Sequence, residues 1–80
     1  MERKMLKAIL QYTDCFQDGR NVFSVLATNN IQILKTQTPI FSIYPRVTVL
    51  FEDTRQLNQV LYDLNQKCRY EVRLVKIKNM

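Results

Sequence analysis

The sequence predicts an α+β fold in which two helices cover one face of a four-stranded antiparallel sheet. Eighty residues are the length of one small domain, which buries about 60% of its unfolded surface. A single Gly and two Pro break the chain rarely, so regular elements should dominate. Apolar residues alternate in four segments and recur at helical spacing in two others. Residues 1–80 are therefore expected to form a single domain.

The first strand is expected over residues 5–12, where apolar and polar side chains alternate. The polar stretch 13–19 is predicted to be a loop. Within it, Asp14 or Asp18 could cap the following helix by accepting backbone N–H bonds.

The first helix is expected over residues 20–30, because its apolar residues recur at spacings of three and four. Asn30 is predicted to end it in a left-handed conformation, since Asn tolerates positive φ. A second strand follows over residues 31–38. The stretch 38–46 contains both prolines and must include a turn, and alternation over 47–51 predicts a third strand.

The second helix is the clearest local prediction. Asp53 or Thr54 starts it, and with Asp53 as the cap Gln56 sits where a capping box needs it. An apolar stripe at i, i+3, i+4 and i+7 then completes the helix to residue 66: Leu57, Val60, Leu61 and Leu64. The last strand is expected from Tyr70 to near Ile77.

The order strand, helix, strand, strand, helix, strand is typical of a ferredoxin-like βαββαβ sandwich, since right-handed crossovers place both helices on one face. The opposite face should carry Lys7, Ile9, Gln11, Thr48, Leu50, Arg73 and Val75. This mixture is too apolar for a freely hydrated surface. We expect a second copy or a neighbouring domain to cover part of it.

The composition excludes most catalytic chemistry. No His is present, which removes the commonest general base and metal ligand, and two Cys cannot make a zinc site. We therefore expect a non-enzymatic domain without metal or cofactor. No apolar run spans a bilayer, and free thiols at Cys15 and Cys68 fit the cytoplasm. The topology places these two cysteines at the same end of the sheet.

An excess of basic residues suggests an alternative function. The chain has twelve Lys and Arg against seven Asp and Glu, and several gather near the C-terminus. These could contact the phosphates of RNA or a ribosome: Lys67, Arg69, Arg73, Lys76 and Lys78. An ordinary solvated surface explains the same charges. Tyr70 is the one aromatic among them, although bases usually stack on several.

The predicted architecture also hosts RNA-recognition modules, metal chaperones and acylphosphatases. Phe51 is expected to point inward, which weakens the RNA-recognition reading. Cys15 alone in the first loop does not make a chaperone site. Arg20 beside one glycine is a poor acylphosphatase loop.

The chain resembles an ACT domain, a small regulatory module appended to enzymes of amino-acid metabolism. The resemblance extends over residues 5–77. The residues that carry it are Thr13-Asp14 and the segments 22–33, 47–53, 57–64 and 70–75. It is most similar to the C-terminal ACT domain of the bifunctional stringent-response enzymes that make and degrade guanosine tetraphosphate. The ACT family has a sequence signature that contains a Gly and an Ile-Asn-Ile segment. Aligned without gaps, this Gly corresponds to Gln17 and this Asn to Gln32.

The resemblance implies a regulatory role in allosteric amino-acid binding or in assembly, commonly as a dimer. In the family the first loop and the start of the first helix hold the ligand. The implied ligand-binding residues are Asp14, Gln17, Asp18, Gly19, Asn30, Ile31 and Gln32. For Asp14 and Asp18, simple turn or cap roles are the alternative.

Overall fold

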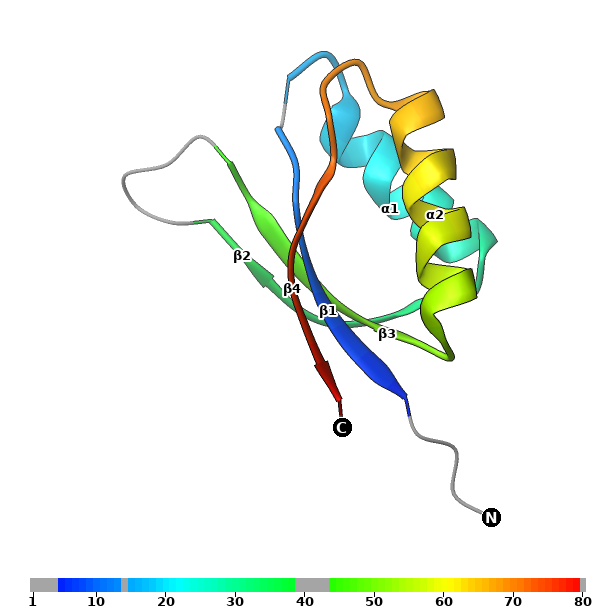
Figure 1. The fold of residues 1–80 in the computed structure, drawn as a ribbon. Coiled ribbons are helices and arrows are strands. Elements are labelled where there is room, and N and C mark those ends of the chain that lie inside the picture. Colours follow the sequence, from blue (N-terminus) through cyan, green and yellow to red (C-terminus); the bar gives the residue numbers. More distant parts are fainter. Residues whose placement is uncertain (1–4, 14, 39–43, 80) are drawn as a thin grey trace.

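The computed structural model describes residues 5–13, 15–38 and 44–79. Its elements follow the predicted order. They are β1 (Leu6–Gln11), α1 (Asp18–Thr28), β2 (Gln32–Gln37), β3 (Arg46–Phe51), α2 (Thr54–Lys67) and β4 (Arg73–Asn79). Figure 1 shows both helices on one side of the sheet. The predicted ferredoxin-like βαββαβ sandwich is confirmed.

The four strands form one sheet in the order β2-β3-β1-β4. Every neighbouring pair is antiparallel. Two residues have no partner in the register, Leu34 opposite β3 and Val75 opposite β1, so each edge strand carries a bulge. The pairing places six of the seven predicted outward residues on the face without helices, and Val75 is the bulge residue.

The core lies between this sheet and the helices. Its members are the inward residues of β1 and β3 together with the apolar stripes of α1 and α2. Phe51 is fully buried among them, as the alternation of β3 predicted. The edge strands are less well covered, and Ile33, Leu74 and Ile77 remain exposed although each pairs with an inward residue or lies beside one.

Helix α1 ends as the sequence predicted. Asn30 has φ 56°, and its N–H donates to the Ala27 carbonyl at 3.1 Å. The N–H of Ile31 donates to the Leu26 carbonyl at 2.9 Å, which completes a Schellman motif. Leu26 and Ile31 are both buried, so the motif also carries its apolar contact.

Helix α2 begins with the expected cap. The Asp53 carboxylate accepts the Gln56 N–H at 2.8 Å. The Gln56 side chain accepts in return the N–H of Glu52, at 2.7 Å, one residue before the cap. This variant of the capping box satisfies two N–H groups at the helix start.

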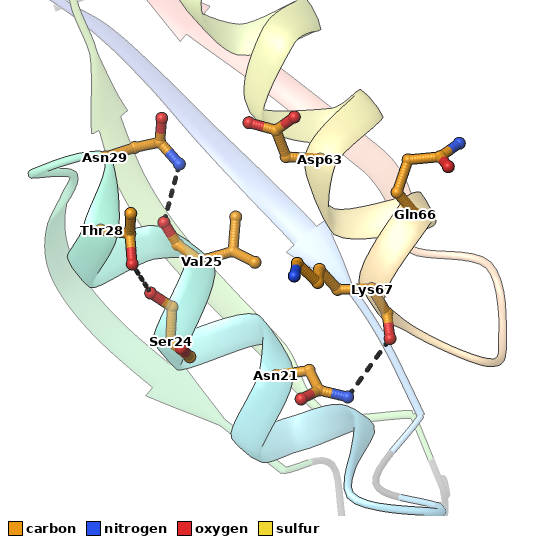
Figure 2. A pocket seen from close by; sticks show the side chains of 8 residues that line it. All are labelled: Asn21, Ser24, Val25, Thr28, Asn29, Asp63, Gln66 and Lys67. Atoms are coloured by element: carbon orange, nitrogen blue, oxygen red, sulfur yellow. Dashed lines mark hydrogen bonds between the residues drawn. The ribbon is translucent and has the colours of Figure 1, made fainter.

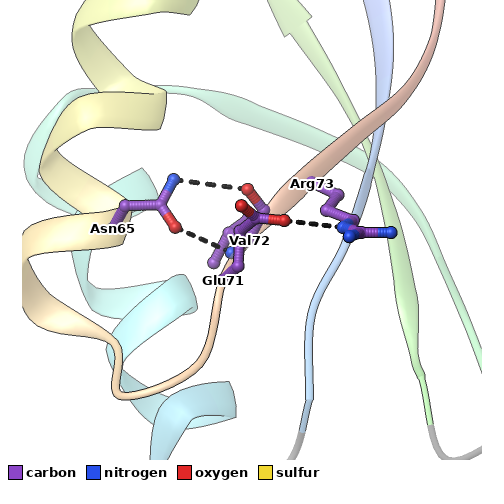
Figure 3. A network of polar contacts seen from close by, with 4 residues as sticks. All are labelled: Asn65, Glu71, Val72 and Arg73. Carbon is purple, nitrogen blue, oxygen red and sulfur yellow. Dashed lines mark hydrogen bonds and ion pairs between the residues drawn. The ribbon is translucent and has the colours of Figure 1, made fainter.

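Several boundaries differ from the sequence prediction by one to three residues, and the starts of α1 and β4 are two of them. Helix α1 begins two residues earlier than expected, at Asp18. Strand β4 begins at Arg73 rather than Tyr70, because the backbone of Val72 bonds to a side chain instead of the sheet. The Asn65 amide accepts the Val72 N–H at 2.8 Å and donates to its carbonyl at 3.3 Å (Figure 3).

Candidate functional site

The loop between β1 and α1 has a strained backbone. Phe16 and Gln17 both have left-handed conformations, with φ of 52° and 66°. For residues other than Gly this conformation costs about 1 kcal/mol or more. Gln17 occupies the position of the signature Gly, and its φ explains why a Gly suits that position. Gly19 does not replace it, because Gly19 has no positive φ.

Asp18 does not cap α1, as the sequence had suggested it could, since no side chain caps that helix. It has a role that the sequence did not indicate. Its side chain is only 1% exposed, and its carboxylate accepts the N–H groups of Arg69 and Tyr70 at 2.8 and 2.9 Å. The Thr13 hydroxyl lies 3.5 Å away. The carboxylate thus ties the first loop to the α2–β4 loop. Its partners are backbone groups about fifty residues away, so no side-chain pattern could have revealed it.

Both cysteines contact the backbone of Asp18, so they lie at the same end of the sheet, as the topology predicted. The Asp18 N–H donates to the Cys15 carbonyl at 2.9 Å, and the Cys68 thiol donates to the Asp18 carbonyl at 3.7 Å. Both thiols are free, Cys15 exposed and Cys68 buried. Burial, and secondarily the Asp18 charge, raises the pKa of Cys68 from 9.0 to about 11.

Aromatic side chains gather at this end of the molecule. Phe16 is 62% exposed and Tyr70 46%, with 6.0 Å between their ring centroids. The Arg69 guanidinium lies 4.3 Å from the centroid of Phe16. Figure 1 shows the two loops that carry these residues side by side.

A cavity of about 320 Å³ lies beside the start of β4. Its lining combines tyrosine rings with one acid and one base: Gln11, Tyr12, Thr13, Tyr44, Tyr70, Glu71 and Arg73. Glu71 and Arg73 pair at 2.6 Å, as Figure 3 shows, and Glu71 raises the pKa of Arg73. Both side chains are largely exposed, so the pair is weak and open to a ligand. No sequence pattern indicates this cavity, although Tyr70 and Arg73 belong to the predicted basic strip.

The remaining predicted ligand residues lie elsewhere. Asn30, Ile31 and Gln32 follow the end of α1, about 17 Å from Gln17 for a helix of this length. Ile31 is buried and Gln32 is exposed. One chain therefore does not bring the two predicted groups together. Asp14 lies outside the described residues.

A second cavity, of about 350 Å³, lies between the two helices. Figure 2 shows polar side chains of α1 and α2 around it. The Asn21 amide donates across it to the Lys67 carbonyl at 3.3 Å. Ser24, Thr28 and Gln66 line it together with the charged residues Asp63 and Lys67. The Asn21–Lys67 bond links α1 to α2, whereas the bonds of Thr28 to Ser24 and of Asn29 to Val25 are local to α1.

The predicted basic strip is divided between three places. Lys67 lines the cavity between the helices, and Arg69 stacks on Phe16. Arg73, Lys76 and Lys78 lie on β4. Within residues 5–13, 15–38 and 44–79, no helix combines the length and apolar character needed to cross a membrane.

The chain is similar in structure to the crystal structure of the ACT domain from the GTP pyrophosphokinase of Chlorobium tepidum. The TM-score is 0.60 at 10% sequence identity, and the match covers 95% of this chain and 96% of that one. The chain has the fold of an ACT domain. This agrees with the sequence resemblance to the ACT domain of a stringent-response enzyme. No protein-family model matches the sequence, and no curated protein does.

Proposed function

We propose that this chain is a non-catalytic regulatory module that binds an amino acid, or mediates the assembly of a larger metabolic or stringent-response enzyme, in the cytoplasm. The observation that carries the proposal is the ACT fold, matched over 95% of the chain. The absence of His from the sequence supports a non-catalytic role.

We place the ligand site at the end of the molecule where Asp18 joins the β1–α1 loop to the α2–β4 loop. An amino acid carries a carboxylate and an ammonium group, and Arg73 and Glu71 offer one partner for each at the mouth of the 320 Å³ cavity. No side chain caps the N-terminus of α1, so its positive dipole end also favours a carboxylate. The tyrosine rings suit an apolar or aromatic side chain.

Assembly as a homodimer is the second part of the proposal. The edge strands carry exposed apolar residues, Ile33 and Leu34 on β2 and Leu74, Val75 and Ile77 on β4. Exposed edges of this kind favour pairing with another chain.

NMR titration of the protein with each of the twenty amino acids tests ligand binding. We expect shift changes in the amides of Thr13, Gln17, Tyr70 and Arg73, with none around the cavity between the helices. Arg73→Gln should weaken binding at least about tenfold, because it removes the carboxylate partner. Arg55→Gln on α2 is the matched control and should leave binding unchanged.

Light scattering on the same samples tests assembly. If the protein dimerises but responds to no amino acid, only the assembly role remains. A monomer that responds to none of the twenty amino acids would overturn the proposal.

A further inference from the structure

A third cavity, of about 360 Å³, lies on the sheet. Its volume is within the usual range of small-molecule sites, roughly 300 to 1,000 Å³. The described residues that line it come from all four strands: Lys7, Ile9, Leu34, Lys35, Gln37, Thr48 and Lys78. The candidate amino-acid site uses none of them. We call this cavity the sheet cavity.

The sheet cavity opens on the face away from the helices. Lys7 and Ile9 alternate with Ala8 and Leu10, which are buried in the core, so they point away from the helices (Figure 1). The pairing carries this orientation to the other strands. The basic residues of the strands all lie on this face: Lys7, Lys35, Arg46, Arg73, Lys76 and Lys78.

Thr48 forms the floor of the sheet cavity. It pairs with Ile9 on β1 and with Lys35 on β2, so it lies in the middle of the face. Although its side chain points away from the helices, Thr48 is only 8% exposed. Neighbouring side chains therefore stand around it, and the face is hollow at this point. A hollow of this kind receives a small molecule better than a broad flat surface.

The bulge in β2 brings an apolar side chain to the same cavity. Leu34 is the extra residue between Ile33 and Lys35, which both pair with β3. Regular alternation would point Leu34 and Lys35 to opposite faces, but both line the sheet cavity. Bulges often redirect a side chain in this way beside a functional site. Together with Ile9, Leu34 gives the cavity an apolar part beside its lysines.

The sheet cavity has three positive charges. They belong to Lys7, Lys35 and Lys78, and none of its described lining residues is acidic. In the part of the chain that the structure describes, these three lysines form no ion pair. Lys7 lies directly opposite Lys78, and like charges in that position destabilise a sheet. An anion bound between them would relieve this repulsion.

We propose that the sheet cavity binds a small molecule that carries two or more phosphate groups. A phosphate monoester has a charge of about −1.5 to −2 near pH 7, so two phosphate groups balance three ammonium groups. Lys commonly binds phosphate as a point charge. The Thr48 hydroxyl and the Gln37 amide can donate hydrogen bonds to phosphate oxygens. Ile9 and Leu34 can pack against the carbon part of the molecule.

Other occupants fit the sheet cavity less well. A free amino acid has no net charge near neutral pH and would leave the three lysines unbalanced. Single-stranded nucleic acid usually stacks its bases on aromatic residues, but none of the described lining residues is aromatic. A second copy docked over the same face would set lysine against lysine, and like charges repel at short distance.

Titration of the whole chain with inorganic pyrophosphate at low salt, followed by NMR, tests the proposal. We expect saturation at one pyrophosphate per chain with a Kd below about 1 mM. The shift changes should centre on the amides of Ile9, Lys35 and Thr48. Inorganic phosphate and succinate carry less charge and should each bind at least about tenfold more weakly.

Two pairs of variants separate the cavity charges from the charge of the whole protein. The triple variant K7Q/K35Q/K78Q should weaken pyrophosphate binding at least about tenfold, whereas R20Q/R55Q/K67Q makes the same charge change on the helices and should retain most of the binding. Lys78→Gln and Lys76→Gln each remove one charge from the same face of β4. Only Lys78 lines the cavity, so the first change should weaken binding more than the second.

A further pair of variants tests the shape of the cavity without changing its charge. Thr48→Leu fills the floor and should weaken pyrophosphate binding at least about tenfold. Gln32→Leu changes the same face outside the cavity and should leave binding unchanged. If circular dichroism shows that Thr48→Leu does not fold, Thr48→Val replaces it. This variant removes only the hydroxyl and should weaken binding at least about threefold.

Absence of pyrophosphate binding would overturn the proposal, as would equal binding of succinate or equal losses in the two triple variants. Binding by Thr48→Leu at the wild-type level would also overturn it, because charge alone would then suffice. An RNA duplex that binds where pyrophosphate does not would assign the face to nucleic acid instead. The amino-acid response of K7Q/K35Q/K78Q should match wild type, so failure of this proposal is distinguishable from failure of the sensor role.

Discussion

The two helices of this protein both begin beside an aspartate, but the two carboxylates act over very different distances. Asp53 is exposed and accepts the N–H of Gln56, three residues along the chain. Asp18 is buried and accepts the N–H groups of Arg69 and Tyr70, 51 and 52 residues away. The first is a local cap, and the second joins two loops at the candidate ligand site. The same residue type at a helix start can therefore serve local structure or tertiary structure.

The largest expected effect is the loss of the Asp18 link. Asp18→Ala leaves the part-buried backbone N–H groups of Arg69 and Tyr70 without their acceptor and should lower the free energy of unfolding by about 3 kcal/mol. Asp53→Ala removes an exposed cap and should cost about 1 kcal/mol. Urea unfolding of the two variants measures both values. Similar losses would show that the Asp18 bonds are no stronger than a local cap.

Next in size is the effect of high pH at the same end of the molecule. The pKa of Cys68 is raised to about 11, whereas the thiol in the unfolded chain ionises near 9.0. Between these values the unfolded state releases a proton that the folded state keeps, so stability falls as pH rises. The loss should approach about 2 kcal/mol at pH 11.

Unfolding measured from pH 8 to pH 11 in wild type, Cys68→Ala and Cys15→Ala checks this effect. Cys68→Ala should lack the thiol-dependent part of the decline. Cys15→Ala should follow wild type, since Cys15 is exposed. An identical decline in all three proteins would argue against burial of the Cys68 thiol.

Asn65 provides a smaller test of how hydrogen bonds fix the α2–β4 loop. Its amide bonds to both backbone groups of Val72 (Figure 3), so Asn65→Ala should cost about 1.5 kcal/mol. Asn58→Ala changes an exposed position of the same helix and should be neutral or slightly stabilising, because Ala favours helices. Thermal melts of the pair give the difference. Equal effects would mean that the Val72 bonds contribute nothing.

The smallest expected effect is a gain. Gln17→Gly relieves a left-handed conformation and should stabilise the fold by about 0.5 kcal/mol, the strain being partly offset by the greater freedom of Gly when unfolded. Gln66→Gly in α2 has no such strain to relieve and should destabilise. Destabilisation by both changes would show that the first loop is not strained at Gln17.

The contrast between the two aspartates also marks how far the sequence predicted the fold and the site. Elements carried by local patterns were predicted well: the stripe of α2 with its Asp53 cap, the left-handed Asn30, and the inward Phe51. Among the boundaries that shifted, the start of α1 at Asp18 involves bonds to a loop about fifty residues away. The start of β4 at Arg73 follows the bonds between Asn65 and Val72, seven residues apart. For the site, the first loop was indicated by resemblance, but the pairing of its Asp18 with a loop fifty residues away has no local signature. Six basic residues of the strands share the sheet face away from the helices, and this follows only from the strand register, which charge counts along the chain do not contain.

Amide hydrogen exchange tests the Asp18 link most directly. In wild type the amides of Arg69 and Tyr70 should exchange slowly although both residues lie in an exposed loop, because their N–H groups donate to a buried carboxylate. In Asp18→Ala, or Asp18→Asn if the first variant does not fold, these two amides should lose more protection than the amides of β1 and β3. The Gln56 amide should lose no more than those strands lose. Exchange of Arg69 and Tyr70 in wild type at the rate of a free peptide would contradict the account.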